Sequence, residues 1–551
     1  MTKLKFKPDF WTFVTLAIAI IFTVLLVYPL FSLFLSGFQD SATGAFTLKN
    51  FAKFFQKKYY YQGMINSFLI TFCVTILAVL IGAPMAYLMS AFKIKGKGFA
   101  EIMIIISMMS PPFIGAYSWV LLCGRSGVAT KFFQNILGIE MPTIYGFPGI
   151  LLVLTLKLYP FIYLYVSGAL AKIDVSLGEA AESLGCSSVK KVFTIILPLI
   201  LPTLLAGSLM VFMNALADFG TPMLIGEGFN VMPVMIYSEF ISEVGGQANF
   251  AASMAVIMVL LTALLFMGQK YIINKKSFTM SSLRPMKAKE ITGIKGVLAH
   301  IAIYFVIFLS IIPQLTVFYT SFLKTRGSMF ADGFSLDSYK AVFERLGTAV
   351  TNTYLYGLMA IAIIVILGMF IAYVTTRKRN IITSFIDAIT MFPYIIPGSV
   401  LGITLLSAFN KKPLVLSGTF VIMIAAYVIR RLPYTLRSSA AILYQISPSI
   451  EEASISLGCS PVKTFFKITA IMMLPGVMAG AILSWITVIN ELSASAILYT
   501  GATRTMSIAI YTEVVRANYG TAAALSSILT ITTIISLLIF FKITGSKSVN
   551  V

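Results

Sequence analysis

Twelve apolar stretches of about 20 residues or more run through this chain, and they restrict its fold more than any other feature. An α-helix needs about 20 consecutive apolar residues to cross a bilayer. The sequence therefore predicts an all-α polytopic protein in a lipid bilayer, with about twelve transmembrane helices. The stretches lie at about 10–35, 65–91, 100–123, 146–170, 198–217, 250–273, 298–322, 352–376, 382–408, 414–436, 471–490 and 522–543.

The composition excludes several other classes of protein. Hydrophobic residues make up 58% of the chain and charged residues 11%, which is more apolar than soluble domains require. The net charge of +21 would suit a nucleic-acid partner, but basic residues in cytosolic loops account for it, so we expect no nucleic acid. The four cysteines have no metal-ligand spacing and there is a single histidine, so we expect no metal and no cofactor.

Lysine and arginine residues indicate which ends of the spans face the cytosol. Most of them fall near the N-terminus and in alternate connections, such as 93–97, 172–191, 270–295 and 377–379. Basic residues are enriched on the cytosolic side of a membrane. We therefore expect both termini in the cytosol and the chain in the cell (inner or plasma) membrane. The first apolar stretch is too long for the apolar core of a cleavable signal.

The two halves of the chain are related by an internal repeat. The sequence around Asn66 matches the sequence around Asn352. Each half holds six predicted spans, an even number, so the halves share one orientation and form a parallel repeat. We expect a first half at 1–269, a basic cytosolic linker at 270–297 and a second half at 298–551.

A polar island at 174–202 separates two apolar stretches of the first half. Ser176 and Glu179 have the spacing of a capping box, in which each side chain bonds a free amide of the first helical turn. Gly185 can take the left-handed conformation that ends a helix. One of the two serines that follow can cap a second short helix. The island therefore predicts two short helices on the cytosolic side.

The same motif recurs in the second half of the chain. Ser449 and Glu452 repeat the capping box, and Gly458 stands where the first copy has its glycine. Ser460 with Pro461 can start the second short helix, because proline suits the first helical position. One capping box marks little more than a helix start, whereas two copies with the same internal spacing indicate a duplicated functional element.

Both copies carry a longer pattern. It resembles the coupling motif of ATP-binding-cassette importer permeases. The first copy reads Glu179-Ala180-Ala181, Gly185, Ile195, Leu197 and Pro198, and the second reads Glu452-Ala453-Ser454, Gly458 and Ile468. The second copy departs from the pattern at Ser454, where alanine is expected, and at Ile471, in place of the first proline.

The resemblance implies a coupling segment in each half, 174–198 and 447–475, that lies in a groove on a cytosolic ATP-binding subunit. It implies two copies of that subunit and an external substrate-binding protein. The chain itself has no G-x-x-x-x-G-K-[ST] phosphate loop and no nucleophile–base constellation. We therefore expect a transport subunit that is not an enzyme, with ATP hydrolysis on a separate subunit.

Polar residues after the fifth span of each half are candidates for the translocation path, because polar groups within a membrane usually face a cavity or a protein interior. Asn214 and Asp218 of the first half match Asn490 and Glu491 of the second. Two matched acids would form a ring of negative charge that stabilises a cation. The alternative is that both acids cap a helix or face outside water.

Glu239 and Glu513 form a second matched acidic pair. The predicted outer segment 218–249 holds four acids and no Lys or Arg. An acidic vestibule of this kind attracts cations, and it would equally dock a basic face of a partner.

The resemblance covers nearly the whole chain and is strongest to fused two-half permeases for ferric iron. Permeases for thiamine and 2-aminoethylphosphonate share the layout, and polyamine permeases share much of the motif. The matched acids favour ferric iron, although thiamine is also a cation, and a phosphonate would need basic groups, of which Lys157 is the main one. An ion-coupled secondary transporter is the remote alternative, and it would have no need for paired coupling segments.

Overall fold

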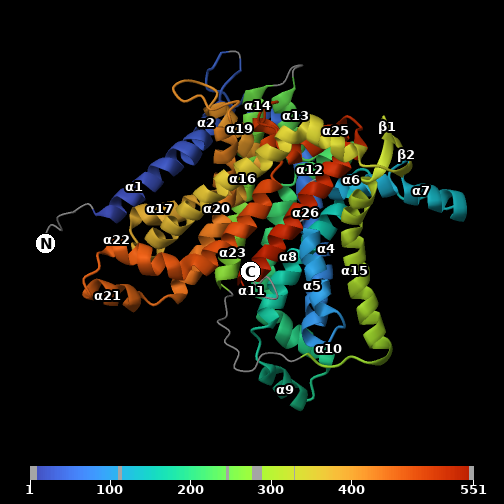
Figure 1. The fold of residues 1–551 in the computed structure, drawn as a ribbon, viewed down its shortest axis with the longest axis horizontal. Coiled ribbons are helices and arrows are strands. Elements are labelled where there is room, and N and C mark those ends of the chain that lie inside the picture. Colours follow the sequence, from blue (N-terminus) through green and yellow to red (C-terminus); the bar gives the residue numbers. More distant parts are fainter. Residues whose placement is uncertain are drawn as a thin grey trace.

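The structure is a computed structural model that describes residues 9–41, 43–108, 114–242, 247–275, 288–327 and 329–544. These residues are mostly helical, as the apolar stretches predict, and they include an antiparallel hairpin of β1 (Leu323–Arg326) and β2 (Met329–Phe334). Figure 1 shows a bundle from which α9 (Val175–Ser183) and α21 (Pro448–Ser456) project, away from the hairpin.

The first half consists of long helices joined by short ones, and η marks a π-helical turn. Its remaining elements are α1 (Phe10–Phe22), η1 (Thr23–Val27), α2 (Tyr28–Gly37), α3 (Lys49–Gln56), α4 (Lys58–Ala91), α5 (Lys97–Met108), α6 (Ile114–Cys123), α7 (Val128–Phe132), η2 (Phe133–Leu137), α8 (Phe147–Leu170), α10 (Ser188–Lys191), η3 (Val192–Ile196), α11 (Leu197–Leu216), α12 (Gly220–Ile225), α13 (Met232–Ile241) and α14 (Ala248–Lys275).

The second half repeats this order, with the hairpin near its start. Its remaining elements are α15 (Gly293–Thr320), α16 (Asp337–Arg377), α17 (Ile381–Ile389), α18 (Phe392–Ile395), α19 (Gly398–Ala408), α20 (Phe420–Gln445), α22 (Pro461–Thr464), η4 (Phe465–Thr469), α23 (Ala470–Ile489), α24 (Ser495–Leu498), α25 (Met506–Val515) and α26 (Tyr519–Thr544).

Nine helices in the described ranges are long and apolar enough to cross a membrane, and each corresponds to one of the twelve predicted spans. The predicted span 100–123 is shared between α5 and α6. The span predicted at 382–408 is divided among α17, α18 and α19, because prolines stand at the start of α18 and at the N-cap of α19. The remaining predicted span, 414–436, lies mostly in α20, where Arg430 and Arg431 interrupt the apolar pattern.

The long helices expose large apolar side chains on the outside of the bundle. Phe13, Leu80 and Phe305 are each more than half exposed. In water such side chains would form an unusually large apolar surface, whereas the acyl chains of a bilayer are a favourable neighbour for them. The exposed faces therefore fit a protein surrounded by lipid.

The duplication is visible in the helix boundaries themselves. The four consecutive elements α9, α10, η3 and α11 have the same lengths as α21, α22, η4 and α23, and all four keep the same sequence offset from their counterparts. α13 and α25 correspond in the same way, with a slightly longer offset. The π-helical turn before the long helix recurs as well, in η3 and η4, so the two halves share this backbone irregularity as well as these helices.

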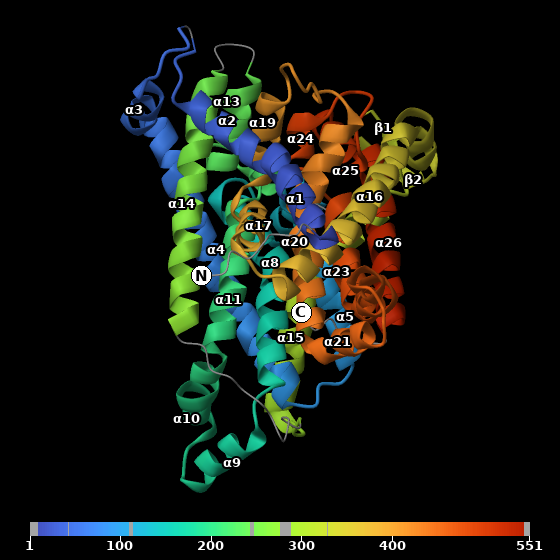
Figure 2. The ribbon, with the colours of Figure 1, turned by 90° about the vertical axis from the view of Figure 1, so that its left-hand side faces the viewer.

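The first helix of each half packs against the opposite half. Trp11 of α1 is buried against Tyr373 of α16 and Phe465 of η4, with ring centroids 4.3 and 4.9 Å apart. In the other direction, the Ser118 hydroxyl of α6 donates to the carbonyl of Pro313 in α15, at 2.8 Å. Figure 2 shows α1 and α2 crossing in front of the second half. These crossed helices tie the two halves together.

Candidate functional site

The two predicted coupling segments form short helices, but both begin earlier than the capping boxes imply. Asp174 is the N-cap of α9, and its carboxylate accepts a hydrogen bond from the Ser176 amide at 2.9 Å. Ser176 is thus the second helical residue and not the cap. In the second copy the N-cap is Ser447, followed by Pro448 at the first helical position. The predicted caps, Ser176 and Ser449, therefore lie two residues after the observed N-caps, and both predictions of a capping box are wrong.

The predicted helix ends are confirmed in both copies. Gly185 and Gly458 adopt left-handed backbone conformations, with φ of 79° and 88°. The amide of Cys186 donates to the carbonyl of Ala181 at 2.9 Å, and the amide of Cys459 donates to the carbonyl of Ser454 at 3.1 Å. This pairing is the Schellman arrangement, which requires a left-handed residue just before the donor and therefore favours glycine.

A second short helix follows each turn and leads back to the bundle. The Ser460 hydroxyl caps α22 by accepting from the Lys463 amide at 3.3 Å, with Pro461 first in the helix. The Ser187 hydroxyl accepts in the same way from the Lys190 amide at 3.4 Å before α10. Each short helix then runs through a π-helical turn into α11 or α23.

The exposure of the coupling residues is the same in both copies. The third residue of each Glu-Ala-Ala/Ser motif is buried, and the first two are not. Ala181 and Ser454 are the buried residues, and Glu179, Ala180, Glu452 and Ala453 are the ones that solvent reaches. Neither glutamate forms a hydrogen bond or ion pair with the described part of the chain, so both carboxylates are available to a partner.

An apolar residue that sequence reasoning missed stands at the tip of each segment. The side chains of Leu184 and Leu457, the C-caps of α9 and α21, are 89% and 87% exposed. Their equivalent positions in the repeat were the signal that could have identified them. Each coupling segment thus presents an exposed apolar side chain at the same position of the repeat.

The two coupling helices differ in how they are attached to the bundle. Glu451 of α21 accepts from Tyr373 at 3.1 Å and from Arg377 Nε at 3.2 Å, and both donors belong to α16. In the first half Glu182 of α9 is bonded by Lys191 of α10, and this hydrogen bond lowers the pKa of the Glu182 carboxyl. α21 is thus tied to a long helix, and α9 is tied mainly to its own neighbour.

The matched acids of the predicted path are each paired with a base. Lys157 Nζ of α8 lies 2.8 Å from Asp218 Oδ2, and the Asp218 side chain is 9% exposed. In the second half Arg430 and Arg431 of α20 both bond Glu491, whose side chain is 1% exposed. Lys157 and Arg430 occupy equivalent positions in the repeat, so one ion pair is duplicated in full.

Each acid also caps the short segment that follows it. Asp218 Oδ1 accepts from the Thr221 amide at 2.8 Å, and Glu491 Oε1 accepts from the Ala494 amide at 3.1 Å. A ring of negative charge around the axis is therefore wrong, because two acids face three basic groups and the cluster carries a net positive charge. The alternative expectation, a helix-end cap, agrees with both hydrogen bonds.

The other predicted path residues bond their surroundings. The side-chain amides of Asn214 and Asn490 donate to carbonyls one turn back in their own helices, at 2.8 and 2.7 Å. Glu239 accepts from the Tyr60 hydroxyl at 3.3 Å. Glu513 is buried and accepts from Asn518 at 2.9 Å.

The predicted acidic vestibule is also partly neutralised. Two of the four acids of 218–249 are paired with bases from outside that segment, since Glu227 lies 2.9 Å from Arg125 and Asp218 is bonded by Lys157. A third, Glu243, lies outside the described residues. The outer surface of the first half is therefore less acidic than its sequence implies.

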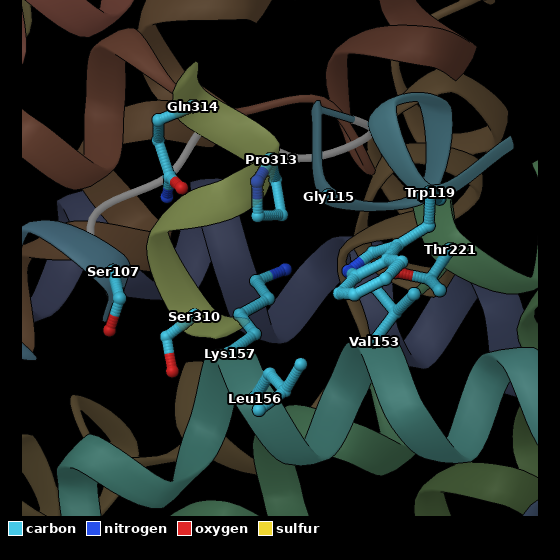
Figure 3. A pocket seen from close by; sticks show the side chains of 11 residues that line it. Ser107, Gly115, Trp119, Val153, Leu156, Lys157, Thr221, Ser310, Pro313 and Gln314 are labelled. Atoms are coloured by element: carbon cyan, nitrogen blue, oxygen red, sulfur yellow. The ribbon is translucent and has the colours of Figure 1, made fainter. Parts of the chain in front are cut away.

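A small cavity lies beside the first ion pair. It has a volume of about 20 Å³, which is enough for one water molecule. Figure 3 shows the Lys157 side chain extending between Pro313 and Ser310 of α15 on one side and Trp119 and Thr221 on the other. The charged end of Lys157 is thus held among residues of both halves.

The two halves also meet at a pair of equivalent tyrosines. The side chains of Tyr237 in α13 and Tyr511 in α25 interact with each other. Tyr237 packs on Phe219, which directly follows Asp218, with ring centroids 4.7 Å apart. Because Tyr237 and Tyr511 are related by the repeat, their contact lies on the pseudo-two-fold axis, at the end of the bundle remote from α9 and α21 (Figure 1).

The sequence is similar to known transport proteins. It is 27% identical to the ferric transport system permease protein of Actinobacillus pleuropneumoniae, over 97% of this chain and 78% of that protein. It is 28% identical to a putative ferric transport system permease protein of Haemophilus influenzae, over 89% of this chain and 78% of the relative. It is 25% identical to a putative 2-aminoethylphosphonate transport system permease protein of Salmonella typhimurium, over 48% of this chain and 91% of that protein.

A family model matches each half of the chain separately. The matched residues are 78–278 and 364–545, and both coupling segments lie within them. The model describes the binding-protein-dependent transport system inner membrane component, which is the permease of an ATP-binding-cassette importer. The protein is therefore a transport subunit of the inner membrane and not itself catalytic. The chain belongs to the binding-protein-dependent transport system inner membrane component family.

Proposed function

We propose that the chain forms both halves of the membrane channel of an importer, and that two copies of a cytosolic ATP-binding subunit drive it through α9 and α21. The observation that supports this most is the duplicated surface formed by Glu179 and Leu184 in one half and Glu452 and Leu457 in the other. A charged and an apolar side chain, exposed together at a projecting turn, suit a groove on a partner.

In this proposal both termini and the linker 270–297 lie in the cytosol, between halves 1–269 and 298–551 of six spans each. The interrupted segments α5–α6 and α17–α19, together with α20, complete twelve spans. An external binding protein delivers the substrate at the opposite end, where Tyr237 and Tyr511 meet. Movement of α9 and α21 with the ATP-binding subunits then separates or closes the halves along their axis.

We propose ferric iron as the substrate, on the strength of the relatives named for ferric transport that align over most of this chain. The paired acids Asp218 and Glu491 add no separate argument for a cation. The path residues Asn214 and Asn490, with Glu239 and Glu513, would then contact the substrate only after the halves move. Thiamine and polyamines, which are cations, have no additional observation in their favour.

A phosphonate is the second candidate, because the basic groups Lys157, Arg430 and Arg431 outnumber the acids that they contact. One relative named for 2-aminoethylphosphonate transport aligns with about half of the chain. An anionic substrate group would be attracted to such a cluster.

Uptake by cells that express the permease with its ATP-binding subunit and binding protein tests the substrate. We expect ATP-dependent accumulation of radioactive ferric iron that excess 2-aminoethylphosphonate leaves unchanged. Accumulation of labelled 2-aminoethylphosphonate, with no iron uptake, would select the second candidate. Uptake that follows an ion gradient and needs no ATP-binding subunit would contradict the importer itself.

A further inference from the structure

The outer end of the second half contains a cavity whose counterpart in the first half is filled by side chains. Its volume is about 660 Å³, which is the size of a ligand site. The walls come from the hairpin, the first turns of α16, the end of α25 and the start of α26. Figures 1 and 2 place these elements at the end of the molecule opposite α9 and α21. We call this cavity the outer pocket.

In the first half, large side chains occupy the region equivalent to the outer pocket. There Lys53 donates to Gln247 at 3.3 Å, and Tyr60 packs on Phe250 with ring centroids 4.7 Å apart while its hydroxyl bonds Glu239. The repeat places small or medium residues at the equivalent positions of the second half. These are Leu346 for Tyr60 by the offset of Asn66 and Asn352, Thr521 for Gln247, and Ala341 for Lys53 when the first residues of α3 and α16 are aligned. The space that large side chains fill in one half stays open in the other.

Seven charged side chains line the outer pocket, and four of them are basic and three acidic. Glu513 is buried near Arg516, at 3.9 Å, and bonds Asn518. Asp337 lies in the first turn of α16, where the helix dipole stabilises a carboxylate. Glu344 also faces the cavity.

Lys340, Arg345 and Arg504 line the same cavity and form no ion pair with the described residues. The Nε atom of Arg504 is buried and has no hydrogen-bond partner there. A buried guanidinium nitrogen without a partner is costly, and a carboxylate is its best partner, because the two groups bond in a planar, two-pronged geometry. The pocket therefore favours carboxylate groups that come from another molecule.

We infer that the outer pocket receives acidic side chains of the external binding protein and so fixes the orientation in which that protein docks. This inference rests on the proposed function, which places the pocket outside the membrane and supplies a partner there. The pocket is close to α25, whose Tyr511 meets the other half on the axis. Docking of acidic side chains against Arg504 and Arg516 therefore acts next to the contact that closes the outer end of the halves.

The experiment uses the whole transporter in nanodiscs and the fluorescently labelled binding protein that stimulates its ATP hydrolysis. The test variant is Lys340→Glu with Arg345→Glu, since both side chains are exposed and their replacement leaves the core intact. The control variant is Lys57→Glu with Lys58→Glu, which makes the same change in charge on exposed residues at the outer end of the first half. A hexaglutamate peptide serves as a small acidic competitor.

We expect the test variant to raise the dissociation constant of the binding protein about tenfold and to weaken its dependence on salt, because rim charges act mainly through long-range attraction. The control should change the dissociation constant less than about twofold. Hexaglutamate should compete with the binding protein on the wild type and not on the test variant.

Equal binding by the wild type and the test variant would overturn the inference, as would an equal loss in the control variant. Binding of free citrate to the pocket that leaves docking unchanged would also overturn it, by showing a small-anion site. A failure of the proposed function has a different signature, because no binding protein would then stimulate ATP hydrolysis by the wild-type transporter.

Discussion

Lys157 Nζ lies 2.8 Å from Asp218 Oδ2, and Arg430 and Glu491, at the equivalent positions of the second half, form the same ion pair. Each acid also accepts an amide hydrogen bond from the segment that follows it. The pair therefore joins three elements of its half: a long helix, the end of the helix that enters from the coupling segment, and the short segment after it.

Replacing Glu491 with glutamine should destabilise the protein more than replacing Asp218 with asparagine. Glu491 is 1% exposed and faces two guanidinium groups, so its neutralisation removes a negative charge that both of them contact. Loss of one partner of a buried pair costs about 3–5 kcal/mol. Thermal unfolding in detergent should show a clearly lower unfolding temperature for Glu491→Gln and a smaller decrease for Asp218→Asn. Equal unfolding temperatures for wild type and Glu491→Gln would contradict this role.

Alanine in place of Gly185 should weaken the first coupling turn through backbone strain alone. A Cβ atom added at Gly185 would meet nothing within 4 Å, so the substitution causes no clash. The backbone φ of Gly185 is 79°, and this left-handed conformation destabilises a residue with a side chain by about 1–2 kcal/mol. We expect Gly185→Ala to slow ATP-driven uptake several-fold. Gly185→Asn is the matched control and should be milder, because asparagine tolerates this conformation. Uptake that falls equally in both variants would show that the backbone conformation is not the cause.

Arg377 should hold the second coupling helix against the bundle. Its guanidinium donates to Glu451 and to the carbonyls of Leu443 and Ile446. Hydrogen bonds to charged groups contribute about 1.5–3 kcal/mol each. Arg377→Gln should therefore release α21 and speed tryptic cleavage after Lys463.

Arg379→Gln is the control for that experiment, since Arg379 is exposed and bonds only Tyr444 among the described residues. It should leave the rate of cleavage near that of the wild type. Unchanged cleavage in Arg377→Gln would mean that other contacts fix α21.

Serine in place of Leu184 and Leu457 should weaken assembly with the ATP-binding subunit and leave folding intact. Both leucines are almost fully exposed, so the isolated permease gains little from them. Burial of one leucine in an interface contributes about 1.5–3 kcal/mol. Titration of the ATP-binding subunit should show at least about a tenfold weaker affinity for the double variant, at an unchanged unfolding temperature. Unchanged affinity would exclude the two tips from the interface.

Local signals in the sequence predicted the coupling segments well. The left-handed glycines and the second caps at Ser187 and Ser460 depend on residues a few positions apart, and the structure confirms them. The first caps were misplaced because Asp174 and Ser447 are equally good caps slightly earlier in the chain. Spacing alone cannot choose between neighbouring polar residues when each can accept an amide.

The pairing of the matched acids could not be read from local sequence, because Lys157 and Asp218 are far apart in the chain and belong to different helices. The repeat did hold a usable signal, since Lys157 and Arg430 are related by the same offset as the two acids. The same sign of charge at both positions predicts a partner of opposite charge at another duplicated position. The outer pocket is harder to predict, because it depends on how much space several separate segments leave.

The most direct measurement is uptake and subunit assembly in the double variant Glu179→Lys with Glu452→Lys. Both carboxylates are accessible and make no bond within the described structure, so we predict the wild-type unfolding temperature. Reversal of both charges should abolish co-purification of the ATP-binding subunit and reduce uptake to background. Uptake that persists in this variant would contradict the account, because transport would then not depend on the two coupling segments.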